Sequence, residues 1–304
     1  MAIEYLLPKD FVASQDALQR CFSAGEARSY TRWLATHHYE NFHVVSFLLP
    51  KHLQQDFYNV YSFCRWADDL GDEIGDTQRS LQLLAWWREQ LHQMYGGTAN
   101  HPVFVALSDT AARRGLPVQP FDDLITAFER DQTITRYETW NDVYEYCRYS
   151  ANPVGRLVLY LFGYADAQRQ SLSDATCTGL QLANFWQDVS VDLLKDRVYI
   201  PLEVMRRYDY TVDDLFAGHE TPAFQNVVRC IVQRARLLFE EGLPLINMVD
   251  KRLSVDLDLF SRGGMFILDK IERENYRVLV RRPAITKTER VMLLLRSLAR
   301  LAYA

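Results

Sequence analysis

The segment FYNVYSFCRWADDLGDEIGD, residues 57–76, passes from an apolar pattern into a run of acids. Its first ten residues carry apolar side chains at helical rather than alternating spacing, and no breaker separates them from Asp68. We therefore expect the acids to continue the helix, with Asp68, Asp72 and Asp76 four residues apart on one face. Each like-charge pair at that spacing costs roughly a few tenths of a kcal/mol, unless the face is well solvated or binds a cation.

The composition predicts a globular, all-α chain. Of the 304 residues, 48% are hydrophobic and 13% aromatic, which is ample for a large core. Helical periodicity fills the segments between Pro and Gly breakers such as Gly96-Gly97, Pro153 and Gly263-Gly264, and no series of alternating strands interrupts it. We expect about ten or more helices in a single domain over residues 1–304, because no shift in composition marks a boundary.

The cysteines and the N-terminus indicate a cytoplasmic location. Five cysteines are odd in number, far apart and without a CxxC pattern, so they predict neither a disulfide framework nor a zinc site. The first residues, MAIEYLLPKDF, lack the features of a signal peptide, and no apolar run approaches the roughly 20 residues of a membrane span. We expect a soluble or peripherally bound protein in the cytoplasm.

The charge is unevenly distributed along the chain. Residues 251–304 have a net charge of +6, which leaves −11 for the first 250 residues of a chain whose net charge is −5. The basic side chains alternate with the apolar runs VMLLL and LARLAYA in an amphipathic helical pattern. A solvated helix face is one interpretation; docking to anionic lipid head groups, on the inner face of the membrane, or to substrate phosphates is the other. The basic residues are Arg273, Arg277, Arg281, Arg282, Lys287, Arg290, Arg296 and Arg300.

A second acidic pattern lies about 120 residues after the first, in LQLANFWQDVSVDLLKDRVYIP, residues 180–201. Asn184, Asp188 and Asp192 are spaced four and four, so a helix would place one amide and two carboxylates on a single face. If this helix faced the first across a bundle, the oxygens of both would form one site. Such ligands suit Mg²⁺, which binds through one or two carboxylates plus substrate phosphates.

Basic side chains near both acidic patterns suit a diphosphate. Arg65 lies three positions before Asp68, and Lys195, Arg197 and Tyr199 follow the second pattern within about two turns. A cation next to a carboxylate also fits a plain ion pair, and that alternative stays open for each of them.

With these motifs the sequence resembles the squalene and phytoene synthase family, the head-to-head prenyl synthases of the all-α isoprenoid fold. The resemblance covers roughly residues 38–276 and implies a helical bundle with a central cavity and an apolar tunnel for C15 and C30 chains. It rests on HYENFHVVSFLLP (38–50), VYSFCRWADDLGDE (60–73), YCRYSANPVG (146–155) and the segment 180–201.

The resemblance assigns roles to individual residues. It implies Mg²⁺ ligation by Asp68, Asp72, Asn184, Asp188 and Asp192. His38, Arg65, Arg197 and Tyr199 become diphosphate contacts, with Lys195 as a further basic candidate. Tyr146 becomes a candidate for orienting the diphosphate or helping proton transfer, although a core tyrosine with a satisfied hydroxyl group is the alternative.

Departures from the family pattern point to a subfamily. Asn41 stands where relatives often have serine, Asn152 lies in SANPVG, and Gln187 precedes Asp188. In three segments, HYENF, SANPVG and NFWQDV, the chain resembles the bacterial hydroxysqualene synthases. Those enzymes act in a three-enzyme route to squalene for hopanoids. By that resemblance the substrate is presqualene diphosphate, a prenyl diphosphate lipid supplied by a sister enzyme, and another enzyme reduces the product. We expect Mg²⁺ but no NADPH, no nucleic-acid partner, and a capturing water held by Asn152 or Gln187.

Three alternatives remain. Glu40–His43 and Glu89–His92 are ExxH patterns, which a four-helix bundle can use for a di-iron centre. The acids could also hold metal as a scaffold without catalysis, which leaves the clustered basic residues unexplained. Within the family, the chain could instead be a presqualene diphosphate, squalene or phytoene synthase that joins two prenyl diphosphates.

Overall fold

The computed structural model describes residues 5–37 and 49–303. Within these ranges the regular structure is helical, with one isolated bridge between Arg136 and Val198 and no strand, so the all-α prediction is confirmed. The chain divides into two compact units, which are described separately: Met1–Thr133 with Arg156–Ala165, and Ile134–Gly155 with Asp166–Ala304. The single domain over residues 1–304 stays a prediction.

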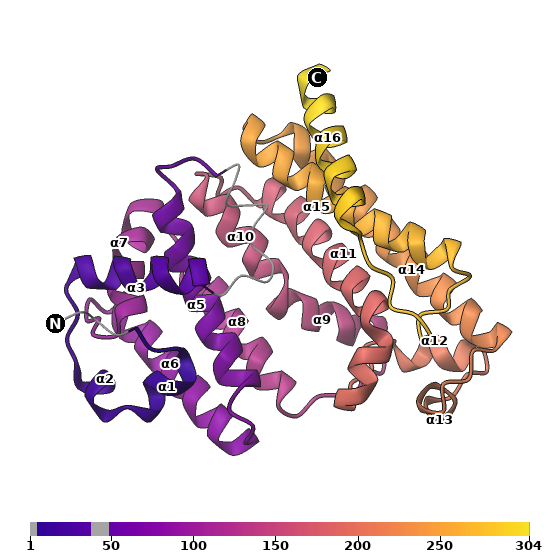
Figure 1. Ribbon diagram of the computed structural model, residues 1–304, viewed down its shortest axis with the longest axis horizontal. Coiled ribbons are helices and arrows are strands. Elements are labelled where there is room, and N and C mark those ends of the chain that lie inside the picture. The colour runs from indigo at the N-terminus through magenta and orange to yellow at the C-terminus, as the bar shows by residue number, and fades with distance from the viewer. Residues whose placement is uncertain (1–4, 38–48, 304) are drawn as a thin grey trace. The chain divides into compact units, whose positions relative to one another are not determined.

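The first unit is built on α5 (Gln54–Asp72), the helix that carries the first acidic motif (Figure 1). The helices α3, α6, α7 and α8 pack against α5 or against one another. α10 (Asn152–Leu161) begins in the second unit and ends in the first. The other helices of the first unit are α1 (Pro8–Ala13), α2 (Gln15–Gln19), α3 (Ala24–His37), α6 (Thr77–Tyr95), α7 (Pro102–Arg114) and α8 (Gln119–Asp131).

An aromatic core fixes the rotation of α5 about its axis. Trp66 stacks on Trp87 of α6 with ring centroids 4.9 Å apart, and Phe63 meets Phe121 of α8 edge-on at 4.8 Å. All four rings are fully buried. Because each such ring buries a large apolar area, α5 cannot rotate without exposing them.

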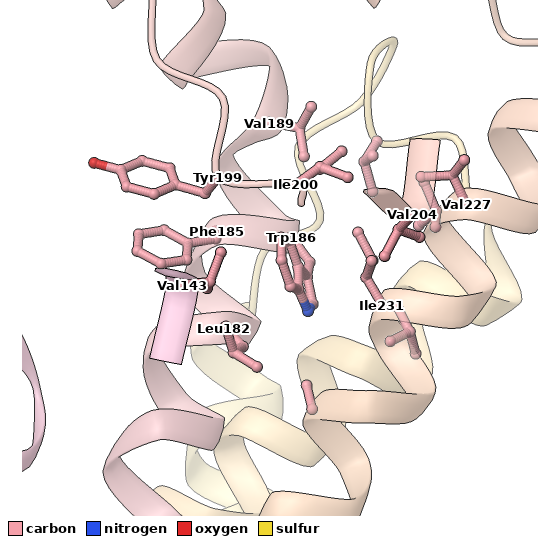
Figure 2. Packing of buried hydrophobic residues seen from close by; sticks show 14 of the residues in the cluster. Val143, Leu182, Phe185, Trp186, Val189, Tyr199, Ile200, Val204, Val227 and Ile231 are labelled. Atoms are coloured by element: carbon pink, nitrogen blue, oxygen red, sulfur yellow. The ribbon is translucent and has the colours of Figure 1, made fainter. Parts of the chain in front are cut away.

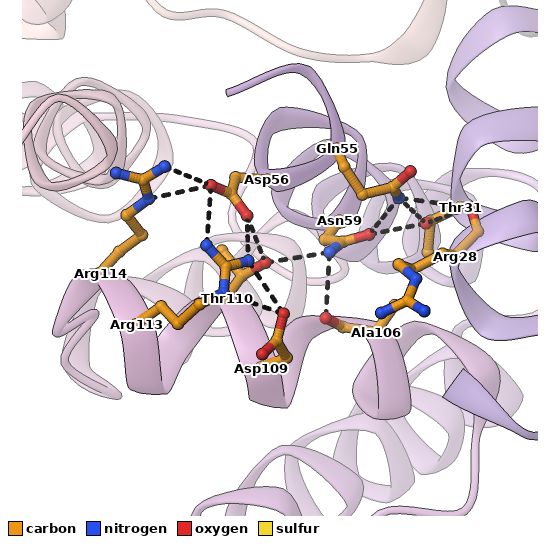
Figure 3. Close-up of polar contacts among 10 residues, drawn as sticks. All are labelled: Arg28, Thr31, Gln55, Asp56, Asn59, Ala106, Asp109, Thr110, Arg113 and Arg114. Atoms are coloured by element: carbon orange, nitrogen blue, oxygen red, sulfur yellow. Dashed lines mark hydrogen bonds and ion pairs between the residues drawn. The ribbon is translucent and has the colours of Figure 1, made fainter. Parts of the chain in front are cut away.

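A buried polar network ties the start of α5 to α7 (Figure 3). Asp56 accepts hydrogen bonds from Arg113 at 2.7 Å, Arg114 at 2.9 Å and Thr110 at 2.9 Å. Burial by itself raises the pKa of Asp56, but these hydrogen bonds outweigh burial and hold the pKa below its ordinary value. Asn59, one turn on, donates to the carbonyl oxygen of Ala106 at 3.0 Å. The network fixes the N-terminal end of α5, and the acidic motif lies at the other end of the same helix.

The second unit is built around α11 (Ala167–Asp192), which carries the second acidic motif and lies beside α14 and α15 (Figure 1). Trp186 of α11 is fully buried and lies beside Val204 and Ile231 (Figure 2). This packing directs the opposite face of α11 outward. The other helices of the second unit are α9 (Trp140–Ser150), η1 (Leu193–Lys195), α12 (Leu202–Arg207), α13 (Val212–Phe216), α14 (Pro222–Gly242), η2 (Leu243–Asn247), α15 (Lys251–Arg273) and α16 (Lys287–Tyr303).

The pair Gly263-Gly264 does not break a helix, and this part of the prediction is wrong. Both residues lie inside α15. A Cβ atom at Gly264 would lie 2.2 Å from Cζ of Phe239, a fully buried ring of α14, whereas Gly263 has no such neighbour within 4 Å. Gly264 is therefore explained by the close approach of α14. Gly96 follows the end of α6 as expected.

No helix in the described part of the chain is both long enough and apolar enough to cross a membrane.

Candidate active site

The helix α5 ends at Asp72, so it is shorter than the acidic run. Asp68 and Asp72 lie one turn apart on it, as predicted, and Glu73 is its C-terminal cap. Asp76 does not extend the acidic face, because it is the N-terminal cap of α6 and accepts a hydrogen bond from the amide of Arg79 at 2.7 Å. The prediction was wrong for Asp76 because a capping carboxylate satisfies amides at a helix start.

Arg65 pairs with two acids of its own helix. Its guanidinium lies 2.6 Å from Asp69 and 3.4 Å from Asp68. Asp69 is buried, while Asp68 is partly exposed and Asp72 is exposed. Arg65 and Asp69 thus form an ion pair within the helix, and Asp68 and Asp72 point toward more open surroundings.

The carboxylates at the end of α5 repel one another. The pKa of Asp68 is raised to about 6, first by burial and further by Asp72, Asp69 and Glu73, even though Arg65 lowers it. A divalent cation bound to Asp68 would relieve this repulsion, since it favours the ionised form. The donor set at the end of α5 therefore fits Mg²⁺.

Asn184, Asp188 and Asp192 lie on α11 at the predicted four-residue spacing. Asn184 is exposed, and the two aspartates are partly buried. The pKa of Asp192 is raised to about 6, first by burial and then by Asp188. This face of α11 offers amide and carboxylate oxygens that fit Mg²⁺ in the same way as those of α5.

Three cations act on the acidic face of α11. Arg197, Lys195 and Arg282 each lower the pKa of Asp192. Arg282 also forms a two-point ion pair with Asp188, in which Nη2 and Oδ2 are 3.1 Å apart. The sequence placed Arg282 in the basic C-terminal pattern, for which binding of substrate phosphates was one interpretation, but did not connect it with Asp188; 94 residues separate the two partners.

Gln187 holds the segment that carries Arg282. Its Nε2 donates to the carbonyl oxygen of Pro283 at 2.6 Å. Gln187 therefore acts on α11 as a structural tie to the residue after Arg282. Whether it also orders a water molecule stays a prediction.

Arg136 clamps the turn that follows α11. Asp196 has a left-handed backbone with φ of 54°, and Arg136 binds both its carbonyl oxygen and its carboxylate. The guanidinium of Arg136 also lies over the ring of Phe216, 5.2 Å from its centroid. No motif in the sequence pointed to Arg136, because its partner is 60 residues away.

Backbone pairing continues the clamp beyond the turn. The amide of Val198 donates to the carbonyl oxygen of Thr135 at 2.9 Å, and the amide of Leu202 donates to that of Tyr137 at 2.9 Å. Residues 135–137 thereby fix the segment that starts with residues 195–197, the basic turn that contains Lys195 and Arg197.

Tyr146 and Tyr199 belong to a buried aromatic group. Tyr199 stacks on Phe185 with ring centroids 3.7 Å apart and planes 5° from parallel, as Figure 2 shows. Tyr146 of α9 lies 5.6 Å from Tyr199 and 5.8 Å from Phe185 between centroids. The rings hold α9, α11 and the segment after the turn together. A contact of either hydroxyl group with diphosphate stays a prediction.

Asn152 is buried at the start of α10. Its Oδ1 accepts a hydrogen bond from Thr178 of α11 at 2.9 Å. The side chain thus links two segments of the second unit. A further role for Asn152 in holding water is untested by this contact.

His38 and Asn41, and the pattern Glu40–His43, lie outside the described residues. In the second ExxH pattern, His92 pairs with Asp122 at 3.0 Å, and Glu89 accepts a hydrogen bond from Gln93. Across residues 5–37 and 49–303, no three His, Cys, Asp or Glu side chains form a ready metal site. Each acidic helix offers only part of a ligand shell, which suits a metal that arrives with phosphate oxygens.

The predicted residues are thus gathered in two groups. The first unit brings Arg65, Asp68 and Asp72 together, and the second brings its amide, acids and cations together around the end of α11. That the two acidic faces lie opposite each other stays a prediction.

Comparison with known proteins identifies the family of this chain. The family model for squalene/phytoene synthase matches residues 35–289. The chain belongs to the squalene/phytoene synthase family. Members of this family are head-to-head prenyl synthases, which act on prenyl diphosphates.

Relatives within the squalene/phytoene synthase family carry more than one activity. A hydroxysqualene synthase of Rhodopseudomonas palustris is 36% identical over 240 residues, 78% of this chain and 80% of the relative. A phytoene synthase of Arthrospira platensis is 31% identical over 279 residues, 86% of this chain and 89% of the relative.

Solved structures of the family share the fold. The squalene synthase HpnC from Alicyclobacillus acidocaldarius superimposes with a TM-score of 0.80 at 44% identity, over 83% of this chain and 95% of that one. A dehydrosqualene synthase bound to a ligand gives a TM-score of 0.81 at 24% identity, over 92% and 98%, which supports the fold alone.

Proposed function

We propose that this chain is a Mg²⁺-dependent hydroxysqualene synthase, which converts presqualene diphosphate and water to hydroxysqualene and diphosphate. The observation that carries the chemistry is the end of α11, where Asp188 and Asp192 stand among Arg282, Lys195 and Arg197. Hydroxysqualene synthases at 32–36% identity support the choice of substrate.

The side chains suit the departure of a diphosphate. Bound Mg²⁺ would stabilise the negative charge that develops on the leaving group. The proposed Mg²⁺ ligands are Asp68 and Asp72 on α5, and Asn184, Asp188 and Asp192 on α11. The cations Lys195 and Arg197 would bind the diphosphate oxygens directly, because charge-assisted hydrogen bonds are the strong ones. Arg136 would keep the turn that presents them in place.

The second half of the reaction is capture of the cation by water. The carbon–oxygen bond to diphosphate breaks and its electron pair leaves with the diphosphate. The resulting cyclopropyl cation rearranges, with cleavage of a carbon–carbon bond of its three-membered ring, to an open-chain C30 cation. A water oxygen then bonds to this cation and one proton passes to the solvent, which gives the alcohol without a reductant. Aromatic faces can stabilise a cation. The buried group of Tyr146, Phe185 and Tyr199 is the proposed source of such a face in the second unit.

Product analysis tests the proposal. Pure protein is incubated with Mg²⁺ and no NADPH, once with presqualene diphosphate and once with farnesyl diphosphate. We expect a C30 alcohol from presqualene diphosphate alone. Conversion of farnesyl diphosphate to presqualene diphosphate or to a hydrocarbon would overturn the proposed substrate and leave the family unchanged.

A synthase that joins two prenyl diphosphates is the second candidate. Phytoene synthases support it, since they align over a larger share of the chain at 30–31% identity. The farnesyl diphosphate arm above, repeated with geranylgeranyl diphosphate, distinguishes this candidate. A C40 hydrocarbon would establish it.

The proposed reaction places the enzyme between two others in the cytoplasm. Its substrate must come from an enzyme that condenses two farnesyl groups, and its allylic alcohol must be reduced by another to give squalene for hopanoids. No nucleic acid takes part.

A further inference from the structure

One face of α16 packs on the protein and the opposite face is exposed. The helix α16 lies along α15 (Figure 1). Leu293 and Ser297 of α16 are buried. Val291 is 56% exposed, Leu295 61% and Leu298 41%. Their spacing of four and three places these three side chains in one stripe along the helix. Large aliphatic side chains at such exposure, side by side, mark an interaction surface.

Basic side chains border this apolar stripe. Helical geometry places Arg290 on one side of it and Arg296 on the other. Glu289 is the only acid of α16, and Lys270 of α15 neutralises it at 2.8 Å. The outward face of α16 is therefore apolar along its centre and positive along its edges. Its exposed cations are Lys287, Arg290, Arg296 and Arg300.

Charge selects the occupant of this face. A second copy docked by two-fold symmetry would bring the same basic edges together, which is repulsive. An anionic partner is favoured, and an apolar stripe with basic edges is the pattern of a helix that lies in a membrane interface. Anionic lipid supplies both the negative charge and the apolar layer that the two parts of the face require.

Short links connect α16 to the acidic end of α11. Lys270 donates to the carbonyl oxygen of Ala284 at 2.6 Å, and Gln187 donates to that of Pro283 at 2.6 Å. Arg282 pairs with Asp188 immediately before these contacts. The segment 282–289 thus connects the proposed diphosphate site to the start of α16 within one unit.

We propose that α16 docks the enzyme on an anionic bilayer, with Val291, Leu295 and Leu298 inserted at the interface and the basic edges on lipid head groups. The choice of a lipid surface rests on the proposed function, because a C30 diphosphate resides in the bilayer. The segment 282–289 links the docked helix to the end of α11.

Vesicle binding of the full chain tests the docking. Sedimentation is measured with vesicles of phosphatidylcholine alone and with vesicles in which roughly one lipid in three is phosphatidylglycerol. We expect binding to the anionic vesicles only, weakened by salt. A variant with Val291→Asn, Leu295→Asn and Leu298→Asn should bind at least about tenfold more weakly. Arg290→Gln with Arg296→Gln should weaken binding roughly 25-fold, about fivefold for each cation.

Two control variants separate docking from general effects. Leu237→Asn replaces a leucine of α14 that is equally exposed. Lys251→Gln with Arg252→Gln removes the same charge from exposed positions at the start of α15. Both should bind as the unaltered protein does. Equal loss in the controls would show that binding is non-specific and would overturn the proposal.

Activity distinguishes this inference from the proposed function. The triple-asparagine variant should keep its rate on presqualene diphosphate in detergent micelles and lose about tenfold on the same substrate in anionic vesicles. Loss in micelles as well, or a dimer that the variant converts to a monomer, would contradict docking to lipid. If the unaltered protein binds anionic vesicles but leaves presqualene diphosphate unchanged, the proposed substrate fails and the docking stands.

Discussion

The acidic end of α5 and the acidic face of α11 carry the same kinds of side chain but obtain their cations differently. On α5, Arg65 lies within four residues of the acids that it pairs with. On α11, Arg282 and Arg136 act from 94 and 60 residues away, on Asp188 and on the turn. In the first motif the acids and the arginine that pairs with them lie on one helix, whereas in the second motif part of the positive charge comes from distant segments. Mutations close to the acids should therefore be the ones that disturb the motif on α5, whereas mutations in distant segments should also disturb the motif on α11.

The largest effect on activity is expected from mutation of the acids, which occur in both motifs. Asp68→Asn and Asp188→Asn should each lower kcat on the order of a thousandfold, because each removes a ligand for the cation that stabilises the leaving group. Steady-state kinetics at saturating Mg²⁺ measure the loss. Asp209→Asn, on an acid outside both motifs, is the control and should retain the normal rate. A loss below about tenfold for Asp68→Asn alone would show that α5 does not share the role of α11.

The two arginines that pair with these acids should separate stability from activity. Arg65→Ala leaves the buried carboxylate of Asp69 without its ion pair, so the free energy of unfolding should fall by about 2 kcal/mol. Arg282→Ala should lower it by less than about 1 kcal/mol, because that arginine is half exposed. Its kcat/KM should nevertheless fall roughly a hundredfold if it binds the diphosphate. Denaturant unfolding and steady-state kinetics are measured for both variants. An equal loss of stability in the two would contradict this prediction.

Arg136, which clamps the basic turn, should affect substrate binding by holding Lys195 and Arg197 in position. Arg136→Ala should raise KM about tenfold, since Lys195 and Arg197 lose a fixed turn. Arg206→Ala removes a nearby ion pair with Glu138 and is the matched control. Calorimetric titration with pyrophosphate and Mg²⁺ reports the same contact without turnover. Identical behaviour of the two variants would show that the clamp has no part in binding.

Packing far from the site should disturb α11 through α14. A methyl group at Gly264 meets the ring of Phe239, which also lies against Gly179 of α11. Gly264→Ala should therefore cost about 1–3 kcal/mol of unfolding free energy. Gly263→Ala, one residue earlier in open space, should be neutral or gain up to about 1 kcal/mol. Thermal unfolding of the two variants tests this, and a stable Gly264→Ala would mean that the Phe239 ring moves freely.

The smallest effect is the pH dependence that both motifs share. The pKa values of Asp68 and Asp192 are raised to about 6 in the folded protein, above their values in the unfolded chain. The folded state then holds more protons than the unfolded state between about pH 4 and 6, so this part of the stability is present at low pH and lost as the pH rises through 6. Solvent screening limits it to less than about 1 kcal/mol for Asp68. Asp192→Asn should flatten the slope in Mg²⁺-free buffer, and an unchanged slope would contradict the raised pKa.

The sequence predicted what depends on local spacing and missed what depends on tertiary contacts. Periodicity and breakers predicted the all-α class, and four-residue spacing placed Asn184, Asp188 and Asp192 correctly on one helix. Asp76 was assigned to the wrong element, because a carboxylate after a short turn serves equally as a helix cap.

Two features had no signal in the sequence. Gly263-Gly264 looked like a break, since the need for a small residue arises from the ring of Phe239 on another helix. Arg136 and its turn are joined across 60 residues, and a single basic residue in a loop carries no indication of its partner. Asn152 and Gln187 were recognised as unusual, but their hydrogen bonds to Thr178 and Pro283 depend on the folded structure.

The most direct measurement is mass spectrometry of the product formed from presqualene diphosphate in ¹⁸O-labelled water, with Mg²⁺ and without NADPH. Capture of the cation by water predicts a C30 alcohol that carries one ¹⁸O atom, and no product from farnesyl diphosphate. An unlabelled hydrocarbon, or a product formed directly from farnesyl diphosphate, would contradict it.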